Sequence, residues 1–253
     1  MRIEVQIAGL ALALVAGAVV AQAKPTPANA PSAKAPPPKA PPAKPAPRDW
    51  NNAIALTPQG THLLGNPAAK VKLTQFISYT CPHCAHFEEQ AEAPLKLVFV
   101  ATGKGSVEVR NFVRDPVDMT VALLTNCGPA TKFFGNHAAF LRSQGTWIQP
   151  MTHPSPTQQA RWSGGTFAKR TRAIARDFGF YPIMASRGYT APQIDKCLAD
   201  EPLARRLAAS TDEAANTLFV TGTPMFAIDG VVLTGTYTWD TLRPQLDARM
   251  RAD

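Results

Sequence analysis

Cysteine is scarce in this sequence, and so are the patterns that hold metal ions. Four of the 253 residues are cysteine and five are histidine. Only Cys81 and Cys84 form a Cys-x-x-Cys pair, and no His-x-x-x-His pair occurs. Structural zinc sites usually take two ligand pairs from separate segments, so an ordinary zinc finger is disfavoured. A metal-binding module that adds His83 or His86 to the two cysteines stays open as an alternative.

Long apolar runs are also missing. The longest, Ile7 to Val20, has 14 residues, fewer than the ~20 that span a bilayer. Arg2 precedes it and Ala21-Gln22-Ala23 follows it. This pattern predicts a secretory signal peptide over residues 1–23, cut after Ala23. An uncleaved membrane anchor stays open as an alternative, whereas a lipid-modified N-terminal cysteine is excluded because no cysteine follows the run.

Acidic residues are absent from residues 24–48, where ten of the 25 residues are proline and five are Lys or Arg. Such a segment has little apolar surface to bury and is typical of an extended polyproline II linker. It carries +5 of the net charge of +8, which leaves +3 for the rest. The basic character therefore belongs to the linker, and it is no argument for nucleic-acid binding.

Residues 49–253 are enough for one α/β domain with an insertion, and no internal repeat is present. Alternating and β-branched residues predict a central strand over Val71–Ile77, and turn signals place short edge strands before it. Further strands are predicted over 106–113, 225–228 and 231–234, with an Asp229-Gly230 hairpin turn. A final helix is predicted to begin after Thr238. Between about 116 and 218 the pattern is helical, with loops expected over 144–165.

The most informative stretch is Cys81-Pro82-His83-Cys84, which follows the central strand. Pro82 suits the first turn of a helix, so we expect a helix from Pro82 to about Ala101, kinked at Pro94. Cys81 then lies at the helix N-terminus, where the macrodipole and free N–H groups favour a thiolate. A thiolate with a second thiol one turn later predicts thiol–disulfide exchange.

Cys127 and Cys197 are the only other cysteines, and they lie 70 positions apart. In an exported protein we expect these two to form a structural disulfide. Two buried free thiols are the alternative.

With these segments placed, the chain resembles the DsbA-like branch of the thioredoxin superfamily from about Asn66 to its end. The resemblance rests on the cysteine motif, the helical insertion and Gly222-Thr223-Pro224 before an Asp-Gly hairpin. It implies a thioredoxin fold, a mixed sheet flanked by helices. It also implies a cis-proline at Pro224, with Thr223 beside Cys81 and pairing with substrate.

The resemblance further implies a periplasmic oxidase that passes the Cys81–Cys84 disulfide to reduced exported proteins. A membrane quinone-linked oxidase of the DsbB kind would re-oxidise it, and no cofactor is implied. With only about twenty residues between the linker and Val71, no dimerisation domain fits, which favours a monomer. A reductase or isomerase of the same fold stays open. His83 is expected to lower the pKa of Cys81 with its ring.

The sequence departs from the family at one position. Members commonly carry an acidic residue six positions before the first cysteine, where this chain has Gln75. Glu88 or Glu108 could take its place in proton transfer.

Overall fold

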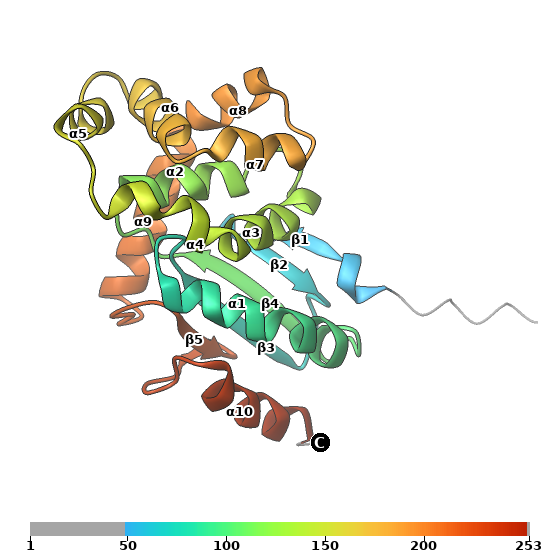
Figure 1. Ribbon diagram of the computed structural model, residues 1–253. Coiled ribbons are helices and arrows are strands. Elements are labelled where there is room, and N and C mark those ends of the chain that lie inside the picture. Colours follow the sequence, from blue (N-terminus) through green and yellow to red (C-terminus); the bar gives the residue numbers. More distant parts are fainter. Residues whose placement is uncertain (1–48, 252–253) are drawn as a thin grey trace, which may run out of the picture. The chain divides into compact units, whose positions relative to one another are not determined.

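The computed structural model describes residues 49–251, which contain a six-stranded β-sheet in the order β1-β2-β4-β3-β5-β6 (Figure 1). β3 and β4 run parallel, and every other neighbouring pair is antiparallel. The strands are β1 (Ile54–Leu56), β2 (His62–Gly65), β3 (Val71–Ile77), β4 (Gly105–Asn111), β5 (Met225–Ile228) and β6 (Val231–Val232). The signal peptide and the linker expected over 1–48 lie outside the described residues.

β3 has the predicted bounds and lies between β4 and β5. Leu73 and Ile77 point to one face of the sheet and join the main core, while Phe76 joins a smaller cluster on the other face. This alternation follows from the two-residue period of a strand. A central strand with apolar residues on both faces is what the sequence pattern predicted.

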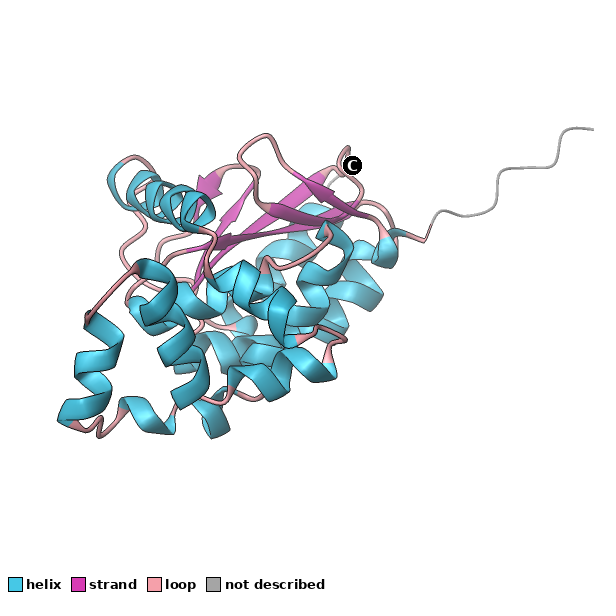
Figure 2. Cartoon of the chain, turned by 90° about the horizontal axis from the view of Figure 1, so that it is seen from above, coloured by secondary structure: helices cyan, strands magenta, loops and turns pink. Residues whose placement is uncertain are grey.

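Most helices lie on one side of the sheet, and α9 (Glu201–Asn216) packs on the other (Figure 2), where its Ala214 joins the cluster of Phe76. α1 (Pro82–Pro94) continues into a π-helical turn, η2 (Leu95–Val100), and α10 (Trp239–Arg251) packs beside α1. Phe87 of α1 contacts Phe226 of β5 and Trp239 of α10, with ring centroids 4.6 and 6.4 Å apart. The change of helix type at Pro94 agrees with the predicted kink, because proline lacks the N–H that an α-helix needs.

The helical insertion runs from α2 to α9, between β4 and β5 in the chain (Figure 1). Side-chain caps begin several of its helices: Asp115, Thr166 and Asp200 each accept a backbone N–H of the first turn. The helices are α2 (Pro116–Thr125), α3 (Phe133–Arg142), α4 (Gln144–Trp147), α5 (Pro156–Ser163), α6 (Phe167–Asp177), α7 (Phe180–Ser186), α8 (Ala191–Leu198) and α9 (Glu201–Asn216), with short 3₁₀ turns η1 (Trp50–Asn52), η3 (Ala130–Lys132) and η4 (Gln149–Met151).

The expectation of loops over 144–165 is wrong. That stretch contains α4, η4 and α5. Ser155 caps α5 in a capping box with Gln158, and Pro156 stands in the first turn. Each of these is a helix-start signal, but the surrounding Pro, Ser and Gly residues obscured them. α7 was also not predicted, although Phe180 and Met184, one turn apart, are fully buried.

The C-terminal hairpin follows the predicted turn, although β6 is shorter than expected. Asp229 and Gly230 have φ values of 52° and 81°, the left-handed conformations that a two-residue hairpin turn needs. The Asp229 side chain also accepts the backbone N–H of Lys72 at 2.8 Å. This contact ties the turn to β3, the strand that leads to Cys81.

A disulfide joins Cys127, which follows α2, to Cys197 in α8. It links two ends of the insertion that lie 70 positions apart in the chain. Tyr189 supports the same region, since its hydroxyl donates to the Cys127 carbonyl at 2.6 Å. The bridge thus fastens the later helices of the insertion to α2.

Candidate active site

Cys81 stands at the junction of the central strand and α1. Its backbone is extended, with φ −92° and ψ 114°, and Pro82 occupies the first turn of the helix. No side chain caps this helix start. The first backbone N–H groups therefore point toward the Cys81 side chain, as the sequence predicted.

Cys81 and Cys84 are both free thiols, and both are buried, with 2% and 1% of their surface exposed. Both cysteines therefore lie below the protein surface. Gln144 of α4 covers the site, because its side-chain amide donates to the carbonyls of Tyr79 at 2.6 Å and Cys81 at 2.9 Å. Gln144 lay in the stretch expected to be a loop, so sequence reasoning missed it.

The pKa values of the two thiols move in opposite directions. The pKa of Cys81 falls to about 5, chiefly because the Cys84 thiol donates to it. Burial opposes this shift, while the Thr223 side chain and the backbone N–H groups of Cys84 and His83 add to it. Burial raises the pKa of Cys84 well above its ordinary value, and the hydrogen bond to Cys81 raises it further. The pair therefore holds one thiolate and one thiol at neutral pH.

Thr223 and Pro224 lie beside Cys81, although they are far away in the chain. The peptide bond between them is cis. The Cys81 Sγ lies 3.1 Å from the Thr223 carbonyl oxygen, to which the thiol can donate. On the outer side, a guanidinium nitrogen of Arg114 lies 3.5 Å from the Thr223 hydroxyl. The bend that carries Thr223 and leads into β5 is thus placed next to the Cys81 sulfur, and the exposed Arg114 lies beside it.

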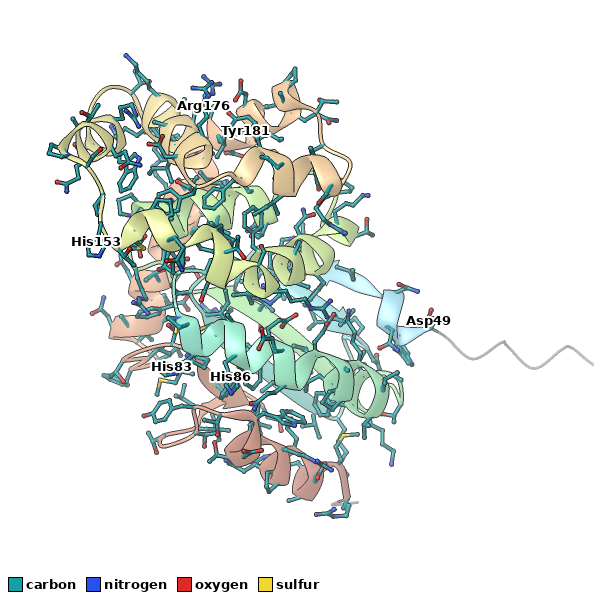
Figure 3. All side chains as sticks on the ribbon, in the orientation of Figure 1. Asp49, His83, His86, His153, Arg176 and Tyr181 are labelled. Carbon is teal, nitrogen blue, oxygen red and sulfur yellow. A yellow bond between two sulfur atoms is a disulfide. The ribbon has the colours of Figure 1, made fainter. Side chains whose placement is uncertain are left out.

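His83 and His86 project from the start of α1, and both are exposed (Figure 3). His86 Nδ1 lies 3.9 Å from Glu89. The sequence predicted that the imidazole of His83 lowers the pKa of Cys81. The contribution of His83 in the structure comes instead from its backbone N–H, which any residue except proline would supply at that position.

The two candidates for the acid missing at Gln75 lie on opposite faces of the sheet. Gln75 is buried beside a cavity of about 30 Å³, which Glu88 of α1 also lines. Glu88 is one helical turn beyond Cys84, so the two side chains share a helix face. Glu108 of β4 lies opposite Thr74, on the other face, and accepts hydrogen bonds from Thr61 and Thr74. Of the two, Glu88 is the carboxylate beneath the cysteines.

Glu88 belongs to a buried polar network that the sequence did not reveal. Its Oε2 lies 3.5 Å from Nε2 of His137, and the other ring nitrogen of His137 lies 3.0 Å from the Tyr79 hydroxyl. Burial raises the pKa of Glu88, but the hydrogen bond and charge of His137, together with the charges of Arg142 and Lys96, outweigh it, so the net shift is downward. Its two partners make His137 a satisfied core residue.

A second buried carboxylate, Asp118, holds the segment before Cys81. One oxygen accepts the N–H of Tyr79 at 2.7 Å, and the other accepts the N–H of Arg114 at 3.0 Å. Burial raises the pKa of Asp118 to about 7, against the lowering effect of its hydrogen bonds with Ser78, Tyr79 and Arg114. Sequence reasoning passed over Asp118, since one acid in a helix start normally suggests only a cap.

Within residues 49–251, no group of three or more His, Cys, Asp or Glu side chains is arranged to hold a metal ion. Over the same residues, none of the helices has the length and apolar character needed to cross a membrane.

Comparison with known proteins agrees with this fold. A family profile described as thioredoxin matches residues 57–248. The chain therefore belongs to the thioredoxin family, and its fold is of the DsbA-like kind. One structure with this fold is α-DsbA1 from Wolbachia pipientis, which is 20% identical, with a TM-score of 0.60 over 76% of this chain and 92% of that one.

Two further relatives carry names that describe disulfide chemistry. The crystal structure of a protein-disulfide isomerase from Novosphingobium aromaticivorans is 58% identical, with a TM-score of 0.73, and covers 76% of this chain and 98% of that one. A protein from Rickettsia felis, named as a protein-disulfide oxidoreductase, is 27% identical over 73% of this chain. The chain spans 58% of the length of that curated relative.

Proposed function

We propose that this protein is a thiol–disulfide oxidoreductase that uses Cys81 and Cys84 to introduce disulfides into substrate proteins. One observation carries the proposal. The pKa of Cys81 is lowered to about 5 while that of Cys84 is raised, and the Cys81 sulfur lies 3.1 Å from the carbonyl of Thr223. A stabilised thiolate beside a backbone segment that can pair with a polypeptide suits exchange with a protein thiol.

The reaction begins with the Cys81–Cys84 disulfide. A substrate thiolate attacks the Cys81 sulfur, which forms a mixed disulfide and releases Cys84 as the leaving sulfur. A second substrate thiolate then attacks the substrate sulfur of the mixed disulfide and expels the Cys81 thiolate. The substrate loses two electrons and gains a disulfide, while the enzyme gains two electrons and becomes a dithiol. The low pKa of Cys81 makes it a good leaving group in the second step.

Thr223 supplies the substrate contact in this scheme. An extended substrate segment can add to its backbone as a short strand, which holds the substrate sulfur against Cys81. Glu88, one helical turn from Cys84, and its partner His137 would deliver the proton that Cys84 takes up when its sulfur is released. The oxidised state is then restored by a partner of the DsbB kind, a membrane quinone-linked oxidase.

Oxidation is the proposed direction because a stabilised Cys81 thiolate favours the dithiol form and makes the disulfide oxidising. Isomerisation is a second candidate, which the name of the 58% identical relative favours. Both use the same two cysteines. The proposed setting is the periplasm, reached through the signal peptide over residues 1–23, and the proposed enzyme acts as a monomer.

Two measurements test this proposal. Oxidised protein is mixed with a reduced, unfolded protein that has one cysteine pair, and thiols are counted on both. For every two thiols that form at Cys81 and Cys84, two substrate thiols should be oxidised to a disulfide. A Cys81→Ala variant should not react. Equilibration with glutathione then gives the potential. A value near the ~−120 mV of DsbA supports the oxidase, whereas one near the ~−270 mV of thioredoxin supports a reductase.

A further inference from the structure

α6 contacts both α2 and α5, and beside the active-site segment an apolar groove lies between the start of α2, the end of α5 and the start of α6. It encloses about 480 Å³. Its walls are mostly apolar and come from five side chains: Val113, Met119, Trp162, Phe167 and Ile174. All but Ile174 are only partly buried, so the groove offers apolar surface to a ligand from solvent.

Arg114 lies between this groove and the Cys81 sulfur. It lines the groove, and its guanidinium reaches to 3.5 Å from the Thr223 hydroxyl. The Thr223 carbonyl in turn lies 3.1 Å from the Cys81 sulfur. A polypeptide that pairs with Thr223 therefore passes beside Arg114, and a few residues further along it meets the groove.

The charges of the groove favour one kind of polypeptide. Arg114 and Arg170 both line it, and neither forms an ion pair with a residue in the described part of the chain. The Arg170 guanidinium donates to the Gly165 carbonyl at 2.7 Å. The one acidic residue of the lining, Asp115, accepts the N–H groups of Val117 and Asp118 and the Thr80 hydroxyl, so its oxygens are occupied.

We propose that this groove binds the segment of the substrate protein next to its reactive cysteine, and selects segments with a large apolar side chain and a carboxylate. The apolar side chain packs against Trp162 and Phe167, and the carboxylate pairs with Arg170 or Arg114. Guanidinium groups suit this role because they bind carboxylates through two parallel hydrogen bonds. The inference rests on the proposed function, since it assigns the substrate preference of the same site.

Three cysteine peptides of equal length test the proposal, each mixed with the oxidised protein while the rate of thiol–disulfide exchange is followed. The first carries Trp and Glu beside the cysteine, the second Trp and Lys, and the third Ser and Gln. The Trp–Glu peptide should react about tenfold faster than the Ser–Gln peptide, which is the gain expected from burying one large side chain. The Trp–Lys peptide should fall between them.

Two variants locate the effect. Arg170→Glu should reverse the order of the Trp–Glu and Trp–Lys peptides, and Phe167→Ser should remove the advantage of both over the Ser–Gln peptide. Arg243→Glu is the matched control, because Arg243 lines another apolar groove, between α10 and η2, and should keep the wild-type order.

The experiment distinguishes a failure of the groove proposal from a failure of the proposed function. Equal rates for the three peptides, or a reversal by Arg243→Glu as well, would overturn the groove proposal and leave the enzyme activity standing. If the oxidised wild-type protein also fails to react with dithiothreitol, the proposed function itself is wrong.

Discussion

Tyr79 and Asp118 connect the active-site segment to the helical insertion: the Tyr79 N–H donates to Asp118 at 2.7 Å. Asp118 also accepts the N–H of Arg114, the residue whose side chain reaches Thr223. One carboxylate at the start of α2 therefore holds the chain just before Cys81 and the chain that approaches Thr223. The two segments that flank the reacting sulfur share this single support.

Asp118→Asn tests the raised pKa of this carboxyl. Because burial raises its pKa from 3.8 to about 7, the folded protein binds a proton that the unfolded chain has lost. The contribution of Asp118 to stability is thus fully present below pH 4 and is lost as the pH rises toward 7, by roughly 1.4 kcal/mol per pH unit. Denaturant unfolding from pH 4 to 8 should show the wild type losing stability relative to the Asn variant. A constant difference between the two would contradict the shift.

Glu88→Gln tests the buried pair with His137. The pKa of Glu88 is lowered, so its ionised form stabilises the folded protein above its ordinary value of 4.5 and loses that effect below it. We expect the variant to be less stable at pH 7 by about 1.5–3 kcal/mol, the usual range for a hydrogen bond to a charged group. The difference should shrink as the pH falls below 4.5.

Glu89→Gln is the matched control for this prediction. Glu89 is the next residue of α1, but its side chain is exposed and faces only His86, at 3.9 Å. Exposed pairs of this kind contribute little, so the variant should unfold much like the wild type. If the two glutamate variants have the same effect, the buried network does not stabilise the fold.

Removing the Cys127–Cys197 disulfide should destabilise the protein. Closing a loop of 70 residues is worth about 4 kcal/mol in the chain-entropy model. A Cys127→Ala, Cys197→Ala double variant should therefore unfold at clearly lower denaturant concentration. Thiol counting gives the independent check: the denatured wild type, with its active site oxidised, should contain no free thiol, and finding two would refute the pairing.

Much of the fold could be predicted from the sequence because its signals are local. β3 alternates and then becomes continuously apolar, and Asp229-Gly230 is one of the few residue pairs that favour a two-residue hairpin turn. α5 shows where such reasoning fails. Ser155, Pro156 and Gln158 signal a helix start, but no buried side chain marks an apolar face. Its helical pattern was therefore too weak to read among the surrounding turn residues.

The active site, too, could be predicted only in part from the sequence. Cys81 and Cys84 follow from a four-residue motif, and Thr223-Pro224 from a second short one. Gln144, Asp118 and His137 could not be found, because each acts through a contact with residues 39 to 65 positions away. No spacing in the sequence records which distant backbone groups a buried polar side chain will meet.

Two substitutions separate the sources of the low Cys81 pKa. Cys84→Ala removes the largest lowering contribution, the hydrogen bond from the Cys84 thiol. His83→Val keeps the backbone N–H through which His83 acts. We therefore expect Cys84→Ala to raise the pKa of Cys81 more than His83→Val does. The opposite order would show that the imidazole, as first predicted from the sequence, dominates.

The most direct test of the account is the ultraviolet thiolate absorbance of the reduced wild-type protein, followed as the pH is raised. A Cys81→Ala variant identifies which transition belongs to Cys81. The account predicts a midpoint at about 5, lost in that variant, with Cys84 still protonated at neutral pH. A first midpoint near ~8.5, the value of an ordinary cysteine, would contradict it.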